Sequence, residues 1–451
     1  DQVQRELREY EGVSVLVYDQ VCATEMRRQR KKDKSLDIAK RTFINAEVCE
    51  GCGDCGVKSN CMSIEPLETE LGRKRRINQS SCNKDFSCVQ GFCPSFITIH
   101  GGSIRRPLRN QKPRAPWPTL PLPELPSVSS GYNVLLAGVG GTGIITVGTL
   151  LATAAQLDGV SSTILDLTGL AQKYGAVMSH VRFANKPESL SSARLGAGEA
   201  DLVIGCDLIV VAGQESLSKM EAGRAFAVVN TAVTPTFEFT RTADWQVDIP
   251  YLLGTLDTRT AGNIRAFDAS CLATGLMGDA IAVNMFLLGY AWQLGRLPLR
   301  LSAIHGAFER SGVEVEFNKE AFEWGRRAAV DIGSVEKEAV ERSGISALGA
   351  GGAALHRVED VIEDRSRRLT HYQDTTYADR YRREVFRFSE LDEHHKAGGR
   401  LALAVARGYY KLLANKDEFE VARQMTSDEF RSLVEAQFEG ALQCVPVGRV
   451  A

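Results

Sequence analysis

The chain has 451 residues, of which 44% are hydrophobic and 24% are charged, and its formal net charge is −2. Such a chain is a globular protein with room for two or three domains. The near-neutral charge excludes a general electrostatic attraction for nucleic acid or for an anionic membrane. The apolar stretch 280–294 is interrupted by Asn284 and Gln293, which suits a buried helix better than a membrane span.

Residues 12–18 form a short apolar run with β-branched residues, which predicts a strand. A lone strand needs partners, so we expect residues 1–44 to be the tail of an upstream domain, followed by a basic connector. A basic connector is usually solvated; the alternative is that it is a docking site for an acidic electron carrier or a nucleotide phosphate. The basic residues are Arg27, Arg28, Arg30, Lys31, Lys32 and Lys34.

Seven of the eleven cysteines fall within residues 49–93. Three of them follow a C-x2-C-x2-C spacing, which places three thiolates on one turning loop, and Cys93-Pro94 supplies the distant ending typical of ferredoxin-type ligation. This pattern predicts a ferredoxin-like iron–sulfur segment over residues 45–104, with a [4Fe–4S] cluster. The candidate ligands are Cys49, Cys52, Cys55, Cys61, Cys82, Cys88 and Cys93.

Two other interpretations of these cysteines compete. Zinc also uses C-x-x-C pairs, but a triple repeat is unusual for a tetrahedral site. A disulfide scaffold needs an oxidising compartment, whereas free cysteines in this number indicate a reducing cytoplasm. Two four-iron clusters would need eight thiolates. We expect the first cluster on Cys49, Cys52, Cys55 and Cys93, a possible second on Cys61, Cys82 and Cys88, and Cys22 as a candidate eighth ligand.

A basic run also lies inside the cysteine-rich segment, at residues 73–76. Positive charge beside a cluster favours its reduced state, so this run is a candidate for tuning the potential as well as for docking a partner. Further along, seven of the fourteen prolines lie in residues 107–126. Proline fixes φ and removes donors, which predicts an extended linker over residues 105–130.

Residues 131–340 are expected to form a Rossmann-like α/β domain. A strand at 132–137 leads into a G-x-G-x-x-G turn and a helix over 144–157, and a second strand at 162–165 ends in Asp166. Such a turn can hold an anionic group at the helix N-terminus, or it can simply allow close packing. The turn glycines are Gly138, Gly140 and Gly143.

A polar loop and strand follow, with four candidates for an anion or substrate contact: Gln172, Lys173, His180 and Arg182. A lone histidine on a strand is more often structural. Further strands are predicted at 208–211 and 227–230. One helix is predicted at 279–294, with Asp279 as its N-cap, and another is predicted at 301–310.

From residue 346 onward we expect a mainly helical C-terminal domain that extends to residue 451. A glycine-rich hinge at 348–354 precedes helical periodicity over 358–390 and 398–440. Thr426 and Glu429 have the spacing of a capping box, which predicts the start of a final helix.

Four motifs together resemble the fused bacterial indolepyruvate ferredoxin oxidoreductases, a group of thiamine-dependent 2-oxoacid:ferredoxin oxidoreductases. They are Cys49-E-G-C-G-D-C, the block from Cys82 to Cys93-Pro94, Gly138-V-G-G-T-G143, and Thr168-G-L-A-Q-K173 with S179-H-V-R182. The resemblance covers nearly the whole chain. It implies that residues 1–44 are the tail of a thiamine-binding domain and that residues 131–340 are a gamma-type domain.

The resemblance implies that a 2-oxoacid such as indolepyruvate is decarboxylated on thiamine diphosphate, that the acyl group passes to coenzyme A, and that two electrons reach ferredoxin. The thiamine diphosphate and magnesium motif of the family has no match here. We therefore expect those cofactors in missing sequence or in partner domains, within an oligomer, and we assign no catalytic residue. Nucleic acid and membrane are not expected partners.

Two rival functions belong to other classes. The first is a pyridine-nucleotide:ferredoxin-type reductase that binds NAD(P)H at residues 138–143 and at Asp166. No flavin site is visible to split a hydride into single electrons, which weighs against it. The second is a non-catalytic adaptor that uses the cysteine-rich segment as a scaffold for docking.

Overall fold

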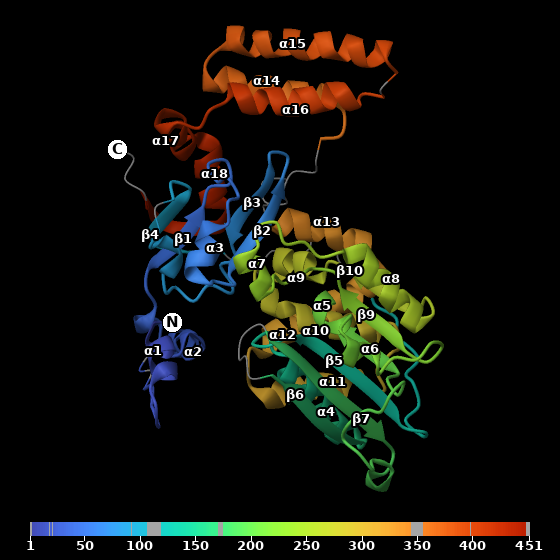
Figure 1. Ribbon diagram of the computed structural model, residues 1–451. Coiled ribbons are helices and arrows are strands. Elements are labelled where there is room, and N and C mark those ends of the chain that lie inside the picture. The colour runs from blue at the N-terminus through green and yellow to red at the C-terminus, as the bar shows by residue number, and fades with distance from the viewer. Residues whose placement is uncertain are drawn as a thin grey trace.

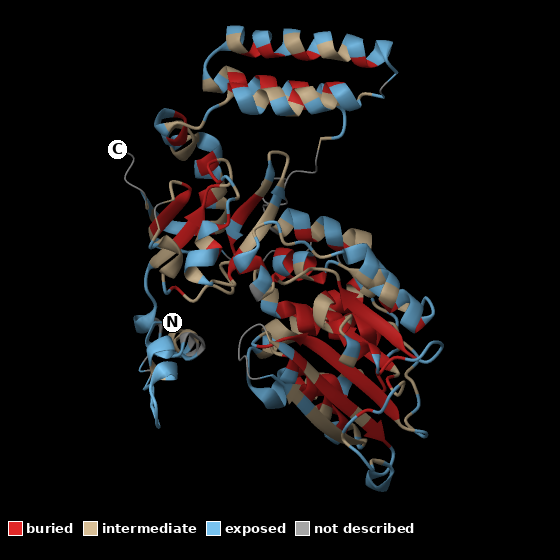
Figure 2. Cartoon of the chain, in the orientation of Figure 1, coloured by how far each residue is buried: buried red, intermediate tan, exposed pale blue. Residues whose placement is uncertain are grey.

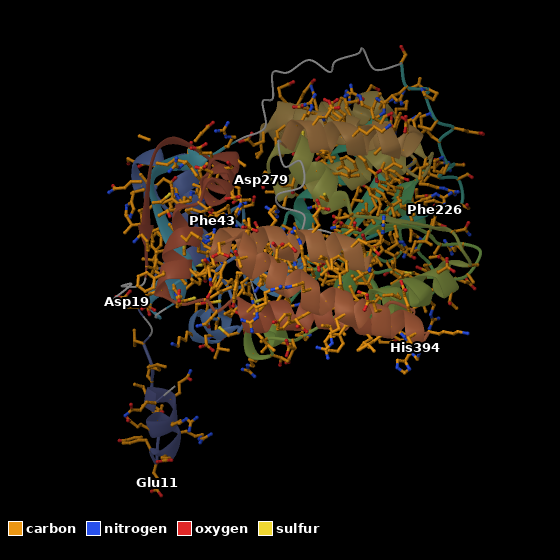
Figure 3. All side chains as sticks on the ribbon, turned by 90° about the horizontal axis from the view of Figure 1, so that it is seen from above. Glu11, Asp19, Phe43, Phe226, Asp279 and His394 are labelled. Carbon is orange, nitrogen blue, oxygen red and sulfur yellow. The ribbon has the colours of Figure 1, made fainter. Side chains whose placement is uncertain are left out.

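The computed structural model describes residues 2–447, apart from 18, 20, 92, 106–118, 170–174, 344–354 and 397. It shows a small β module, a six-stranded α/β domain and a helical bundle (Figure 1). Two N-terminal helices precede the module, α1 (Gln2–Glu9) and α2 (Ala23–Lys32). Figure 3 shows α1, with Glu11 beyond its end, standing away from the body of the molecule. None of the helices in the described part is long and apolar enough to cross a membrane.

The strand predicted over residues 12–18 is wrong for the residues that the structure describes there. Residues 13–17 form no regular structure, and Val13 and Val17 are 93% and 82% exposed. The sheets of the described chain contain no strand that pairs with them. A β-prone sequence without a ladder partner gains too little to become a strand.

The cysteine-rich segment folds into a three-stranded antiparallel sheet and a separate hairpin. The sheet has the order β1 (Lys40–Ile44), β4 (Phe96–Ile104) and β11 (Phe438–Pro446), so its third strand comes from the end of the chain. The hairpin consists of β2 (Ile64–Thr69) and β3 (Gly72–Ile77). The short helices are η1 (Lys34–Leu36), α3 (Asp54–Ser59) and η2 (Ser87–Val89).

The two faces of this sheet bury different neighbours, because successive side chains on a strand point to opposite faces. Phe43, Ile97 and Ile99 pack with helix α18 (Asp428–Gln437) and with the start of β11. On the other face, Ile44 and Phe96 pack against the cysteines. The cysteines therefore lie against a fixed apolar surface instead of on a free loop.

The α/β domain has a six-stranded sheet of order β10-β9-β8-β5-β7-β6. Strands β5, β8, β9 and β10 run parallel, whereas β7 runs antiparallel to both β5 and β6. Figure 2 shows the buried strands of this sheet. The strand bounds are β5 (Tyr132–Val139), β6 (Ser161–Thr168), β7 (Ala176–Ala184), β8 (Leu202–Gly205), β9 (Phe226–Asn230) and β10 (Ile264–Phe267).

Helices bury both faces of this sheet. The larger core joins α4 to the helices α9–α13, and the smaller core lies under α5, α6 and α8. The helix bounds are α4 (Ile144–Asp158), η3 (Pro187–Ser189), α5 (Leu208–Val211), α6 (Gln214–Leu217), α7 (Phe237–Arg241), α8 (Ile249–Thr260), α9 (Ala269–Met277), η4 (Ala280–Ala282), α10 (Val283–Gln293), α11 (Leu301–Ser311), α12 (Val315–Val330) and α13 (Ile332–Ser343).

Most predicted elements of this domain are confirmed: the strands at 132–137 and 227–230 and the helices at 144–157, 279–294 and 301–310. Asp279 accepts the N–H of Ile281 and so caps η4, one short turn before α10. The strand predicted at 208–211 is wrong. These residues form the helical turn α5, because Asp207 accepts the N–H of Val210 and fixes a helix start. The strand lies just before it, as β8.

The C-terminal part contains the helices α14 (Val358–Tyr372), α15 (Thr375–His394), α16 (Arg400–Leu413), α17 (Glu418–Thr426) and α18, followed by β11. The helical domain is confirmed, but its predicted continuation to residue 440 is wrong, because residues 438–446 pair with β4. The predicted capping box is also wrong. Ser427, not Thr426, accepts the N–H of Phe430 and caps α18.

We expect the crossing of α10 and α12 to tolerate no side chain at its two glycines. A Cβ at Gly325 would overlap the carbonyl oxygen of Phe286, and a Cβ at Gly289 would overlap that of Phe322. Gly325→Ala should therefore lower the free energy of unfolding by about 2–3 kcal/mol, the usual cost of overpacking.

Urea unfolding of the variant measures this effect. The matched control is Gly254→Ala on α8, where a Cβ meets nothing within 4 Å. Alanine there should be neutral or raise stability by about 0.5–1 kcal/mol, since it only improves helix propensity. Equal effects of the two substitutions would contradict the packing of α10 against α12.

Candidate functional site

Three of the predicted cluster ligands come together as a first thiol group: Cys49, Cys55 and Cys93. Cys49 follows β1, Cys55 lies in the first turn of α3, and Cys93 precedes β4. Burial raises the pKa of the Cys55 thiol to about 12, and the neighbouring thiols of Cys49 and Cys93 add to the shift. The nearby Arg75 guanidinium acts against it, since positive charge favours the thiolate.

Three other cysteines form a second thiol group: Cys61, Cys82 and Cys88. Burial raises the pKa of the Cys88 thiol to about 12, with further contributions from Cys61 and Cys82. Burial also raises the pKa of Cys82, with a smaller contribution from Cys61. Cys55 thus lies near Cys49 and Cys93, and Cys88 lies near Cys61 and Cys82, while their assignment as cluster ligands stays a prediction.

The remaining cysteines lie outside these two groups. Cys52 is exposed on the loop between Cys49 and α3, and Cys22 is exposed at the start of α2. The structure describes all eleven cysteines of the chain and joins none of them in a disulfide. Cys22 is therefore not packed into the module in this conformation.

The donor atoms of this module are cysteine sulfurs, two of which have a backbone N–H beside them. Among the described residues, no three His, Cys, Asp or Glu side chains converge closely enough to hold one ion. A zinc site needs four ligands at about 2.0–2.3 Å from one centre. A [4Fe–4S] cluster takes its thiolates around an inorganic core instead. Two backbone N–H groups already point at sulfur, Gly51 to Cys49 at 3.3 Å and Lys84 to Cys82 at 3.4 Å, as cluster ligands require.

The loop that carries the first thiol group needs glycine at two positions. Gly51 and Gly53 have φ of +73° and +86°, a region that side chains rarely adopt. A Cβ at Gly51 would overlap the carbonyl oxygen of Arg73. A Cβ at Gly53 would lie 2.8 Å from the Cβ of Ala243, which belongs to the α/β domain. The loop is therefore confined by the hairpin on one side and by the α/β domain on the other.

The basic run on β3 attaches the cysteine module to the α/β domain. Arg73 donates to the carbonyl of Trp245 at 2.7 Å. Arg75 donates to the carbonyl of Ala243 at 2.9 Å and lies over the ring of Phe239, 4.7 Å from its centroid. Lys74, which is buried, donates to the carbonyl of Cys49 at 2.7 Å. These cations hold the cysteine module and the α/β domain together and place positive charge beside the first thiol group.

Two side chains of the predicted basic connector also bond to the module. Arg27 donates to the carbonyl of Ser80, and Arg30 donates to the carbonyl of Asn83 at 2.6 Å. Both acceptors lie on the loop around Cys82. The solvated interpretation is therefore wrong for Arg27 and Arg30, which anchor α2 against the second thiol group.

The predicted glycine turn follows β5, and its glycines serve close packing. A Cβ at Gly138 would lie within 3.1 Å of the Cβ of Cys206 and closer still to Ile144. The N–H of Gly140 is used by the carbonyl of Gly175 at 2.7 Å. Gly143, with φ of +100°, begins the turn into α4. These features match the packing role that the sequence left open.

The strand order sets this domain apart from the dinucleotide-binding arrangement. In that arrangement the acidic residue ends the strand beside the glycine-bearing one. Here β7 lies between β5 and β6, so Asp166 is two strand spacings, about 10 Å, from β5. In the strand register, Asp166 lies opposite Ser179 of β7. Ser179 in turn lies opposite the middle of β5 and not opposite its end. The geometry gives no support to a ribose contact.

The other predicted contact residues lie away from this turn. Gln172 and Lys173 are outside the described residues. His180 and Arg182 pair with the first half of β5, about 10–17 Å along the strand from Gly138. His180 has no exposed surface and its Nδ1 accepts the N–H of Leu195 at 2.9 Å. Arg182 donates to the carbonyl of Ser192 at 3.2 Å. Both side chains thus fasten the loop after β7 to the sheet, and their ligand role stays a prediction.

Sequence reasoning missed the residues that hold these pieces in place. Asn284 donates to the carbonyl of Thr142 at 2.9 Å and so fixes the glycine turn to α10. The segment 237–245 contacts the basic run and Gly53 of the Cys49–Cys55 loop, and Val447 packs from the end of the chain into the apolar cluster that contains the cysteines. No local pattern marks these contacts, because each joins residues far apart in the sequence.

The comparisons with known proteins match the α/β domain and the C-terminal region separately. Residues 133–328 match the family described as pyruvate ferredoxin/flavodoxin oxidoreductase. Residues 358–447 match a family of unknown function. The first of these matches lies in the α/β domain and covers less than half of the chain.

The curated relatives match less than half of this chain. The indolepyruvate oxidoreductase subunit IorB of Methanothermobacter thermautotrophicus is 29% identical over 173 residues, 38% of this chain and 84% of the relative. The IorB subunit of Thermococcus kodakarensis is 27% identical over 203 residues, 45% of this chain and 97% of the relative. A keto/oxoacid ferredoxin oxidoreductase gamma subunit from Geobacter sulfurreducens is 22% identical, with a TM-score of 0.32, over 44% of this chain and 98% of its own.

We expect His180 to make folding stability depend on pH. Burial lowers its pKa from 6.5 to about 4, with help from the cations of Lys219 and Arg194. Between pH 4 and pH 6.5 the unfolded chain therefore binds a proton at His180 that the folded chain does not bind. The contribution of His180 to the free energy of unfolding is thus complete above pH 6.5 and is lost as the pH falls toward 4. The shift corresponds to about 3 kcal/mol.

Urea unfolding of the wild type and of His180→Gln at several pH values isolates this effect, because other titrating groups are shared. The wild type should lose about 3 kcal/mol more than the variant between pH 6.5 and pH 4. Parallel stability curves for the two proteins would contradict a neutral buried His180.

Proposed function

We propose that this chain is the electron-transfer and gamma-type part of an enzyme that oxidatively decarboxylates arylpyruvates, with indolepyruvate as the substrate and ferredoxin as the electron acceptor. One observation carries the proposal: two separate thiol groups are held in the module that Arg73 and Arg75 fasten to the family domain. The names of the curated relatives support indolepyruvate as the substrate.

The overall reaction converts a 2-oxoacid and coenzyme A into acyl-coenzyme A and CO2, and it releases two electrons that reduce two ferredoxins. Thiamine diphosphate and magnesium would be held by other domains of the enzyme, because this sequence has no match to their motif. An iron–sulfur cluster, when bound, supplies one-electron transfer. The work of this chain is then to hold clusters at a fixed distance from partner domains and to keep water away from them.

Each thiol group would hold one cluster. Cys49, Cys55 and Cys93, joined by the exposed Cys52, give the four thiolates of the first. Cys61, Cys82 and Cys88 give three thiolates of a second. Lys74 and Arg75 place cations beside the first group, which favours an added electron and so a higher reduction potential there.

The decisive experiment is iron and acid-labile sulfide per chain after anaerobic purification. Two clusters predict about eight of each, and one cluster predicts about four. Cys49→Ser and Cys88→Ser should each remove about half of the iron, because they belong to different groups. Cys271→Ser is the matched control, since Cys271 lies on α9 outside both groups.

Stoichiometric zinc without sulfide would contradict the proposal. So would equal and complete iron loss in both variants, which would mean a single site. Reduction of the bound iron by NADH alone would instead favour a pyridine-nucleotide oxidoreductase, and iron that no physiological donor reduces would favour an adaptor.

A further inference from the structure

The C-terminal region 358–447 matches a family without a known function, yet its last part is built into the cysteine module. Strand β11 pairs antiparallel with β4, with Val445 opposite Thr98 and Pro446 opposite Ile97. Beyond the strand, the N–H of Val447 donates to the carbonyl of Phe96 at 2.9 Å. Val447 then packs in the apolar cluster that contains Cys49, Cys55 and Cys93 of the first thiol group together with Cys82 and Cys88 of the second.

The hydrophobic core beneath β11 is shared between the two regions. Phe438 has no exposed surface and meets the ring of Phe43 edge-on, with centroids 6.2 Å apart. Phe430 lies 6.1 Å from the same ring. Figure 3 shows Phe43 within this body of the molecule, far from His394 at the end of the helical bundle. In the described structure, α18 and β11 have their apolar contacts here, whereas α14–α16 form a core of their own.

Polar contacts from the same region converge on the residues around Cys49. Arg368 pairs with Glu47 at 2.6 Å, and Lys416 pairs with Glu50 at 2.5 Å. The amide of Asn45 donates to the carbonyl of Gln424 at 3.2 Å. The loop that leads into the first thiol group is thus held on several sides by the C-terminal region.

A third ionic contact fixes the hairpin that carries the basic run. Arg365 is almost fully buried, and its guanidinium pairs with Glu70 at 2.9 Å, in the turn between β2 and β3. Lys74, on that hairpin, bonds the carbonyl of Cys49. Breaking a buried ion pair is costly, so the hairpin and the C-terminal region should move together.

We propose that the region of unknown function closes the iron–sulfur module: it completes the sheet with β11 and shields the first thiol group from water and oxidants. The inference rests on the proposed function only in naming a cluster as the ligand of the thiols. Solvent exposure is one of the factors that set the potential of such clusters, so a cap at this place controls both access and redox behaviour. The helical bundle α14–α16 positions the cap through its ion pairs.

The test uses the full-length chain with Phe438→Ala, which removes the shared core contact. Its matched control is Phe419→Ala, the same chemical change at a side chain of the same region that is 78% exposed. The first measurement is N-ethylmaleimide alkylation of the metal-free protein, followed by mass spectrometry for each cysteine. We expect Cys49 and Cys55 to react at least about tenfold faster in Phe438→Ala, with Cys206 in the α/β domain unchanged and with no effect of Phe419→Ala, because a buried thiol reacts only as fast as its cover opens.

A second variant, Val447→Ser, changes the contact nearest the thiols and leaves the Phe438 core intact, in case Phe438→Ala does not fold. The second measurement is the rate of iron loss in air, which should rise about tenfold in either variant. Unchanged alkylation of Cys49 and Cys55 in both variants would overturn the proposal. Faster alkylation in a chain that binds no iron would support the cap and refute the cluster, so the two proposals fail separately.

Discussion

The central constraint on the module is the burial of its thiols: Cys49 is buried, and Cys55, Cys61, Cys82, Cys88 and Cys93 are partly buried. Burial raises the pKa of Cys55 and Cys88 to about 12, so these sulfurs are held as neutral thiols when nothing is bound. A bound iron–sulfur cluster would offset this desolvation, because bonds from iron to the thiolates would replace their lost contacts with water. The positive φ of Gly51 and the contacts of Lys74 and Arg75 serve the same end, since they fix the loop around the first group.

Three parts of the chain meet at this module. The α/β domain contributes the segment 237–245, the N-terminal part contributes α2 through Arg27 and Arg30, and the C-terminal region contributes β11. Figure 1 shows the module between the α/β domain and the helical bundle. An electron-transfer unit needs this kind of fixed placement, because it must stand at a constant distance from the domains that deliver electrons. The match to the pyruvate ferredoxin/flavodoxin oxidoreductase family covers the α/β domain, and the match to the family of unknown function covers the C-terminal region.

The sequence alone predicted the features that are encoded locally. The glycine turn indicated a strand and helix at 132–158, whereas the cluster assignment from the C-x2-C-x2-C run and Cys93-Pro94 stays a prediction. The strand at 208–211 failed because a short apolar run does not distinguish a strand from a buried helical turn. The side-chain cap at Asp207 decides in favour of the helical turn at these residues.

The remaining differences come from pairings between distant residues. The insertion of β7 between β5 and β6 moves Asp166 away from the glycine turn, and the pairing of β11 with β4 joins residues more than 300 positions apart. Helical periodicity before residue 438 gives no indication of that pairing. The same limit applies to His180, whose burial by the loop after β7 could not be read from its place on a predicted strand.

Low-temperature electron paramagnetic resonance of the dithionite-reduced protein tests the central claim most directly. Two separate thiol groups predict two reduced clusters that lie close together, and therefore about two unpaired spins per chain with broadening from their mutual interaction. A silent spectrum from protein that holds stoichiometric zinc, or a single isolated spin in the wild type that is unchanged in both Cys49→Ser and Cys88→Ser, would contradict it.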